Sequence, residues 1–135
     1  MKIGLLEQSL VKVDGNAEET LAESLRLAQI AEEMGYSRIW VSEHHDSEAI
    51  AGSSPEVLLA ALGAATKKIR LGSGGVMLPH YSPLKVAENF AVLSNLYPGR
   101  IDLGIGRAPG ADIKTAIALA TDAKPKFERF PDLVR

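Results

Sequence analysis

Four short hydrophobic segments recur along the chain at nearly constant intervals. They cover residues 3–6, 38–42, 69–73 and 101–105, and their starts lie roughly 30 to 35 residues apart. That interval is too long for a tight hairpin, but it leaves room for a helix and two loops, which parallel strands require. Because the segments do not alternate strictly between polar and apolar residues, we expect both faces of the sheet to be covered. The spacing therefore predicts an α/β fold of about four β/α units with parallel strands.

The segment between the first two predicted strands carries clear helix boundary signals. Asn16 can cap a helix and Glu19 follows it at capping-box spacing, while Gly35 can adopt the left-handed conformation that ends the helix. The face expected to contact the sheet consists of Leu21, Leu25, Ala28, Ala31 and Met34.

Two further helices are predicted to begin at Ser-Pro pairs. Ser54-Pro55 and Ser82-Pro83 each place a hydroxyl at the capping position and a proline in the first turn. The second of these helices should end at Pro98-Gly99. We expect residues 1–135 to form a single domain. Its last part, residues 111–135, is predicted to be weakly structured and to contain a short helix over 113–120.

Composition excludes several kinds of site. The 135 residues include 15 basic and 17 acidic side chains, so the net charge of −2 provides no field that would attract nucleic acid or an anionic membrane. There is no cysteine, which excludes disulfides and thiolate chemistry and fits a reducing compartment. The longest apolar run, residues 57–65, is too short to span a membrane, and the N-terminus has no signal-peptide core. We therefore expect a cytoplasmic protein.

Polar side chains follow the second predicted strand in the run Glu43-His44-His45-Asp46. In parallel α/β folds ligands bind at the carboxyl ends of the strands, where a histidine can move protons near neutral pH. A hydrogen-bonded packing role for such a histidine is equally consistent with the sequence. Adjacent strand residues point to opposite faces, so His44 and His45 are not expected to share a metal ion, and we predict no metal site.

Small residues and one arginine follow the third and fourth predicted strands. Gly74 and Gly75 would let a flat ligand approach the backbone, although a tight strand exit would also need small residues. Arg107 could bind a phosphate or carboxylate, or it could pair with Asp102 or Asp112. From the residues alone, a ligand-binding role and a structural role both stay open for the glycine pair and for Arg107.

Four stretches of the chain together resemble the N-terminal half of the bacterial luciferase-like flavin monooxygenase family. They are Glu-His-His at 43–45, Gly-Gly-Val-Met-Leu-Pro at 74–79, Ser-Pro at 82–83 and Pro-Gly-Arg-Ile-Asp-Leu-Gly-Ile-Gly-Arg-Ala-Pro-Gly at 98–110. Each one lies at a predicted strand end or helix start, and the match covers almost the whole chain. The resemblance implies a partial TIM-type (β/α)8 barrel.

The resemblance also implies a function. It implies a flavin-dependent oxidoreductase that uses reduced FMN, or in one branch of the family the deazaflavin F420, with O2 to oxygenate a small organic substrate. A flavin reductase would supply the electrons. His44 matches the family's active-site histidine, and Gly74 and Gly75 match small residues that commonly form a cis peptide bond under the flavin ring. Arg107 matches a position near the flavin phosphate, and Glu43 and Val76 would line the same pocket.

The chain is shorter than such a barrel, which normally needs about 250 residues. The predicted units account for four of the eight strands, and a half-barrel leaves strand edges uncovered. We therefore expect the site to be completed by a second copy of the chain or by a companion chain. Two alternatives stay open, namely a non-catalytic half-barrel that binds flavin or pairs with a partner, and a truncated inactive copy of a longer enzyme.

Overall fold

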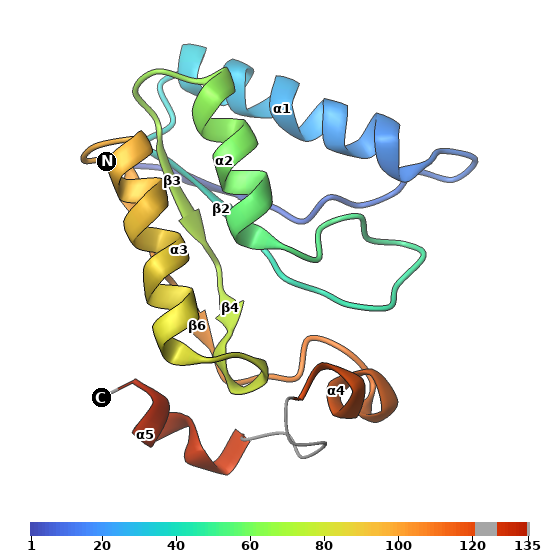
Figure 1. The fold of residues 1–135 in the computed structure, drawn as a ribbon. Coiled ribbons are helices and arrows are strands. Elements are labelled where there is room, and N and C mark those ends of the chain that lie inside the picture. The colour runs from blue at the N-terminus through green and yellow to red at the C-terminus, as the bar shows by residue number, and fades with distance from the viewer. Residues whose placement is uncertain (121–126, 135) are drawn as a thin grey trace.

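The computed structural model describes residues 1–120 and 127–134 as alternating strands and helices (Figure 1). In chain order the elements are β1 (Gly4–Glu7), α1 (Ala17–Glu33), β2 (Arg38–Val41), α2 (Pro55–Ala65), β3 (Arg70–Ser73), β4 (Val76–Met77), η1 (Leu78–His80), α3 (Pro83–Leu96), β5 (Ile101–Asp102), β6 (Ile105–Gly106), α4 (Ile113–Leu119), η2 (Phe127–Arg129) and α5 (Phe130–Leu133). The predicted β/α alternation is confirmed.

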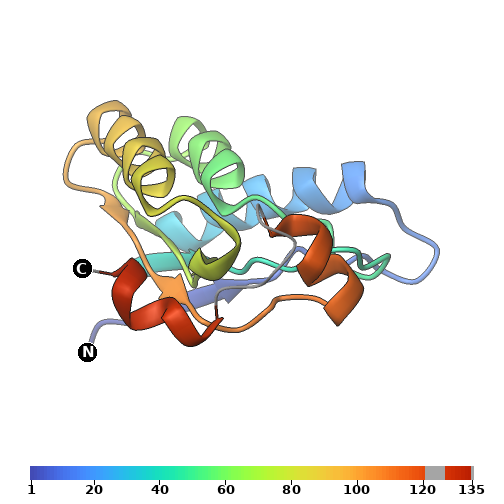
Figure 2. The same ribbon diagram turned by 60° about the horizontal axis from the view of Figure 1, so that its bottom comes forward.

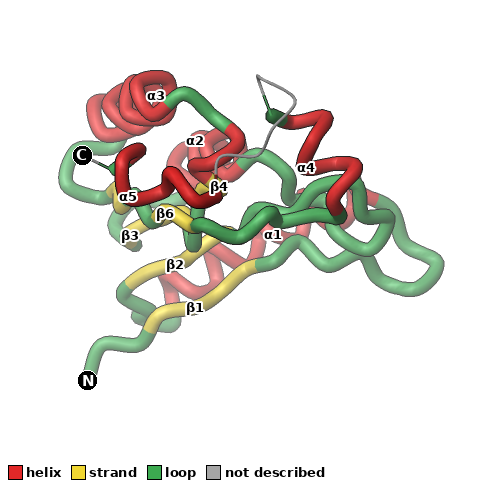
Figure 3. Tube along the Cα trace, turned by 90° about the horizontal axis from the view of Figure 1, so that it is seen from below, coloured by secondary structure: helices red, strands yellow, loops and turns green. Residues whose placement is uncertain are grey.

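The main sheet is parallel, with the strand order β1-β2-β3-β5. Helices α1, α2 and α3 form one layer on the same face of this sheet (Figure 2). Seen from below, β1 and β2 lie in front of α1 (Figure 3). The expectation that both faces would be covered is wrong for the described residues, since Leu6 of β1 remains 55% exposed.

The fourth predicted strand, residues 101–105, is interrupted. Its first part, β5, pairs with β3, whereas its second part, β6, pairs with β4 in a separate two-stranded sheet. The break lies at Gly104, whose carbonyl accepts a hydrogen bond from the Ser73 hydroxyl at 2.8 Å and whose N–H donates to the same hydroxyl at 3.0 Å. A side chain thus replaces the strand partner at this point, and the chain changes direction.

Helix α1 begins as the sequence predicts. The Asn16 side chain accepts a hydrogen bond from the backbone N–H of Glu19 at 2.9 Å, and Gly35 has a φ of +80° just beyond the helix. Ala28 and Ala31 are buried, but Met34 is 70% exposed. The prediction for Met34 is wrong because the helix ends at Glu33, so Met34 no longer continues the apolar face.

Helices α2 and α3 begin at Pro55 and Pro83, as predicted. The predicted caps are wrong, since neither Ser54 nor Ser82 forms a side-chain capping hydrogen bond. Proline supplies the start signal by itself, because it has no N–H to satisfy and its φ suits the first turn. The end of α3 before Pro98-Gly99 is confirmed.

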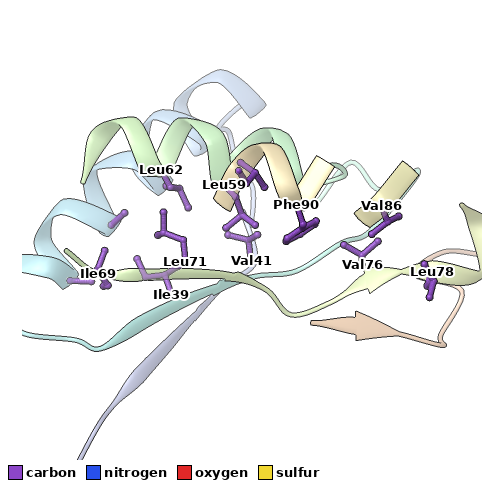
Figure 4. Close-up of a cluster of buried hydrophobic side chains, with 13 residues drawn as sticks. Ile39, Val41, Leu59, Leu62, Ile69, Leu71, Val76, Leu78, Val86 and Phe90 are labelled. Carbon is purple, nitrogen blue, oxygen red and sulfur yellow. The ribbon is translucent and has the colours of Figure 1, made fainter. Parts of the chain in front are cut away.

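The hydrophobic core lies between the helical layer and the sheet (Figure 4). Ile39 and Val41 of β2 and Leu71 of β3 point toward Leu59 and Leu62 of α2, and all five are at most 1% exposed. This packing fixes which face each strand residue occupies, because neighbouring residues alternate between faces. Arg38 and Trp40 therefore lie on the opposite face of the sheet.

That opposite face carries a cluster of charged side chains. Asp102 accepts hydrogen bonds from Arg38 Nε at 2.7 Å and from Arg70 Nη2 at 2.6 Å, and the Arg38 guanidinium lies 4.9 Å from the centre of the Trp40 ring. Burial alone would raise the pKa of Asp102, but the hydrogen bonds from Arg70 and Arg38 outweigh it, so this pKa lies below its ordinary value of 3.8.

The Asp102 cluster should make stability depend on pH in the acid range. A carboxyl whose pKa is lowered by folding stabilises the fold above its ordinary pKa of 3.8, and this contribution is lost as the pH falls through the lower folded value. We expect Asp102→Asn to cost about 1 to 3 kcal/mol at pH 7 and less at pH 3, measured by urea unfolding. An equal cost at both pH values would contradict the assignment. Glu48→Gln, which removes an exposed carboxylate, serves as the control.

The C-terminal part of the described chain contains α4 and α5. Asp112 caps α4 by accepting a hydrogen bond from Thr115 N at 2.8 Å, and the predicted short helix over 113–120 is confirmed. α5 packs near η1. Part of the segment predicted to be weakly structured, residues 121–126 and 135, lies outside the described residues. Among the helices that the structure describes, none combines the length and hydrophobicity of a membrane span.

Candidate functional site

The carboxyl end of β2 and the segments that follow β3 and β5 lie next to one another. The backbone N–H of Gly74 donates to the Val41 carbonyl at 2.7 Å, and that of Val76 donates to the Gly104 carbonyl at 2.9 Å. The predicted strand-end residues are therefore brought to one edge of the fold, which is where ligands bind in parallel α/β proteins.

Glu43 lies at the end of β2 and is completely buried. Its Oε1 atom accepts hydrogen bonds from His45 Nε2 and from the Tyr81 hydroxyl, both at 2.7 Å. Its Oε2 atom accepts from the backbone N–H of Met77 at 2.9 Å. Glu43 thus joins the end of β2 to β4 and to Tyr81, the residue that follows η1.

His44 differs from its neighbour. Its backbone N–H donates to the Gly52 carbonyl at 3.1 Å, but its Nδ1 atom is buried and has no hydrogen-bond partner among the described residues. Buried polar atoms are usually paired, so an unpaired one calls for a specific reason. His45, by contrast, is engaged with Glu43. The residues that the structure describes include no group of three or more His, Asp or Glu side chains suited to a metal ion.

Gly74 and Gly75 are joined by a cis peptide bond, as the resemblance implies. A Cβ atom on Gly75 would lie 2.9 Å from the backbone carbon of Ile105, so the close approach of the β6 strand explains why this residue must be small. Val76 is 2% exposed and belongs to the hydrophobic core. Packing therefore accounts for the side-chain size at these positions, and the backbone is the part that can face a ligand.

Arg107 is exposed directly after β6. The alternative that it pairs with Asp102 or Asp112 is wrong, because Asp102 binds Arg38 and Arg70 and Asp112 caps α4. Within residues 1–120 and 127–134, Arg107 takes part in no ion pair. Its guanidinium therefore keeps its donors available for an anionic group.

The structure adds two side chains that the sequence did not single out. Tyr81 donates its hydroxyl proton to Glu43, and its pKa is raised well above the ordinary value by burial and by this carboxyl. His80, beside it, is 2% exposed and lies 2.7 Å from the Pro109 carbonyl. The one available signal was their position, as polar aromatic residues between a strand exit and a helix start.

Comparison with known proteins agrees with this arrangement. A family model described as luciferase-like monooxygenase matches residues 1–135. The N-acetyl-S-alkylcysteine monooxygenase of Bacillus subtilis (strain 168) is 52% identical over 132 residues, which cover 98% of this chain and 40% of that protein. The chain thus spans about 40% of the length of the curated relatives it matches.

Two solved structures are similar in sequence as well as in fold. The crystal structure of apo-MsnO8 has a TM-score of 0.93 and 44% identity, over 98% of this chain and 40% of that one. The oxygenating constituent of 3,6-diketocamphane monooxygenase from Pseudomonas putida, a type II Baeyer-Villiger monooxygenase in complex with FMN, has a TM-score of 0.84 and 27% identity, over 100% of this chain and 36% of that one. The expected fold, a parallel α/β unit of a larger barrel, is confirmed.

Proposed function

The chain belongs to the luciferase-like monooxygenase family, and from that premise we propose that it carries the flavin site of a monooxygenase that oxygenates a small organic substrate with reduced FMN and O2. The observation that carries the proposal is the buried Nδ1 atom of His44, which has no partner among the described residues. An unpaired imidazole nitrogen at the ligand-binding edge of the sheet is suited to exchange a proton with a bound molecule.

The residues at this edge fit a phosphorylated flavin. The cis Gly74-Gly75 bond presents backbone without side chains, which suits a flat ring, and it leads directly into Val76, whose side chain is buried in the core. Arg107 is exposed and free of ion pairs in the described part of the chain, which suits a phosphate. Glu43 is buried next to these residues, and its hydrogen bonds hold the end of β2 in place. When bound, reduced flavin supplies two electrons with which O2 transfers one oxygen atom to the substrate and releases the other as water.

We favour FMN over F420. The support is a solved relative of 27% identity that is in complex with FMN. F420 is the alternative cofactor, and it also carries a phosphate that Arg107 could bind. A flavin reductase as the electron source and a cytoplasmic location are further parts of the proposal.

The open face of the sheet supports the proposal that a second half completes the site. Leu6 of β1 lies on this face and is 55% exposed. Apolar residues exposed in this way favour association. We propose that a second copy or a companion chain covers this face. The same exposure supports, as a second candidate, a non-catalytic half-barrel that binds flavin or pairs with a partner.

A substitution of His44 tests the proposed chemistry. If Nδ1 moves a proton, His44→Ala should slow oxygen-dependent turnover about 100- to 10,000-fold and leave flavin affinity nearly unchanged. Oxygen uptake with reduced FMN measures the turnover, and fluorescence titration measures the affinity. Unchanged turnover at saturating flavin would refute the role. Turnover by this chain without any partner would exclude the non-catalytic candidate.

A further inference from the structure

His80 is a buried side chain to which the proposed function gives no role. It ends η1, between β4 and α3, and is 2% exposed. Its Nε2 atom lies 2.7 Å from the carbonyl oxygen of Pro109, and its Nδ1 atom is buried with no hydrogen-bond partner among the described residues. A carbonyl oxygen can only accept, so Nε2 carries the proton and donates it.

The bond from His80 reaches the loop that carries Arg107. Pro109 lies two residues after Arg107, and the next residue, Gly110, is also anchored, since its carbonyl accepts a hydrogen bond from the His45 backbone N–H at 3.0 Å. A Cβ atom on Gly110 would lie 3.2 Å from the Glu43 carbonyl oxygen, so the loop packs tightly against the end of β2. The backbone near Arg107 is thus held in place by the hydrogen bonds that Pro109 and Gly110 accept.

The orientation of the His80 ring is fixed by its neighbours. The rings of His45, Tyr81 and Phe127 stand edge-on to it, with centroids 6.2, 6.1 and 5.6 Å away. Among the described residues, His80 is the one side chain that donates a hydrogen bond to a carbonyl of residues 107–110. The hydrogen bond from His80 is therefore the contact of this loop that a side-chain substitution can remove.

We propose that His80 is a positioning residue that fixes Arg107 for the phosphate group of the flavin. Arg107 has no ion pair of its own in the described structure, so the loop sets the point from which its side chain extends toward a ligand. A two-point contact between guanidinium and phosphate depends on geometry, so a loop that moves weakens it. The inference rests on the proposed phosphate role of Arg107.

The test compares His80→Phe with Tyr97→Phe. Both variants place a phenylalanine where an aromatic ring stood and remove one 2.7 Å side-chain hydrogen bond to a carbonyl, that of Pro109 in the first case and that of Ala60, away from the strand ends, in the second. In His80→Phe we expect the His45 amide to exchange its hydrogen about ten times faster, and FMN but not riboflavin to bind about ten times more weakly. Tyr97→Phe should change neither quantity. His80→Gln, whose amide N–H can reach the same carbonyl, should restore both in part.

The possible results separate this inference from the function on which it rests. Unchanged exchange at His45, or an equal loss of FMN and riboflavin affinity, would overturn the role of His80. If Arg107→Ala lowers FMN affinity while His80→Phe does not, only the positioning role fails. If Arg107→Ala itself has no effect on FMN affinity, the proposed phosphate site fails, and the positioning role fails with it.

Discussion

With Arg107 replaced by alanine, the protein is expected to bind FMN about 10 to 100 times more weakly and riboflavin equally well. A hydrogen bond to a charged group contributes about 1.5 to 3 kcal/mol. The loss of that contribution corresponds to this range of affinity. Arg107 is exposed and free of ion pairs within the described residues, so its removal should leave the fold intact. Flavin fluorescence titration of both ligands measures the effect.

Arg26→Ala is the matched control for Arg107. Arg26 is an exposed arginine in the middle of α1, and its loss changes the net charge by the same amount. It should leave the affinity for FMN unchanged at moderate ionic strength, because distant surface charges are screened. Equal weakening of FMN and riboflavin by Arg107→Ala would show that the arginine does not contact the phosphate.

Replacement of Glu43 by alanine should destabilise the fold by about 3 to 6 kcal/mol. The substitution removes the acceptor for His45 Nε2, the Tyr81 hydroxyl and the Met77 N–H in a fully buried position. Each buried donor left without a partner costs about 1 to 3 kcal/mol. Since domains are stable by about 5 to 15 kcal/mol, we expect a large shift of the urea midpoint or no cooperative transition.

Two milder variants separate the parts of the Glu43 cluster. Tyr81→Phe removes one of the three hydrogen bonds, so it should cost about 1 kcal/mol. Glu43→Gln keeps the shape and one acceptor oxygen, and its cost should lie between those of Tyr81→Phe and Glu43→Ala. If Glu43→Ala costs less than about 1 kcal/mol, the carboxyl does not organise the strand ends, and a direct role at the ligand becomes the better explanation.

The elements that depend on local chemistry were predictable from the sequence. Asn16 and Gly35 mark the ends of α1, and Pro55 and Pro83 mark helix starts, because capping and the fixed φ of proline act within one turn. The break in the fourth strand was not predictable in the same way. It depends on the Ser73 hydroxyl, which reaches Gly104 from another strand.

The residues of the candidate site likewise divide into those that local position predicts and those that depend on contacts with distant residues. Strand-end position was enough to select Glu43, His44, Gly74 and Arg107, because parallel strands bring their carboxyl ends to one edge. His44 has an unpaired Nδ1, whereas His45 binds the carboxyl of Glu43. That carboxyl is also bound by Tyr81 and Met77, more than 30 residues away, and these contacts are not visible in the sequence. For the same reason His80 could not be connected to Arg107 from the sequence alone.

The central claim is that the strand ends of this chain form a flavin site, and equilibrium titration of the purified protein with FMN tests it most directly. Flavin fluorescence would report binding, and light scattering on the same sample would report the mass of the assembly. The account predicts saturable FMN binding by an assembly in which a second copy or a companion chain covers the open face of the sheet. An absence of saturable binding, in every assembly that the chain forms, would contradict it.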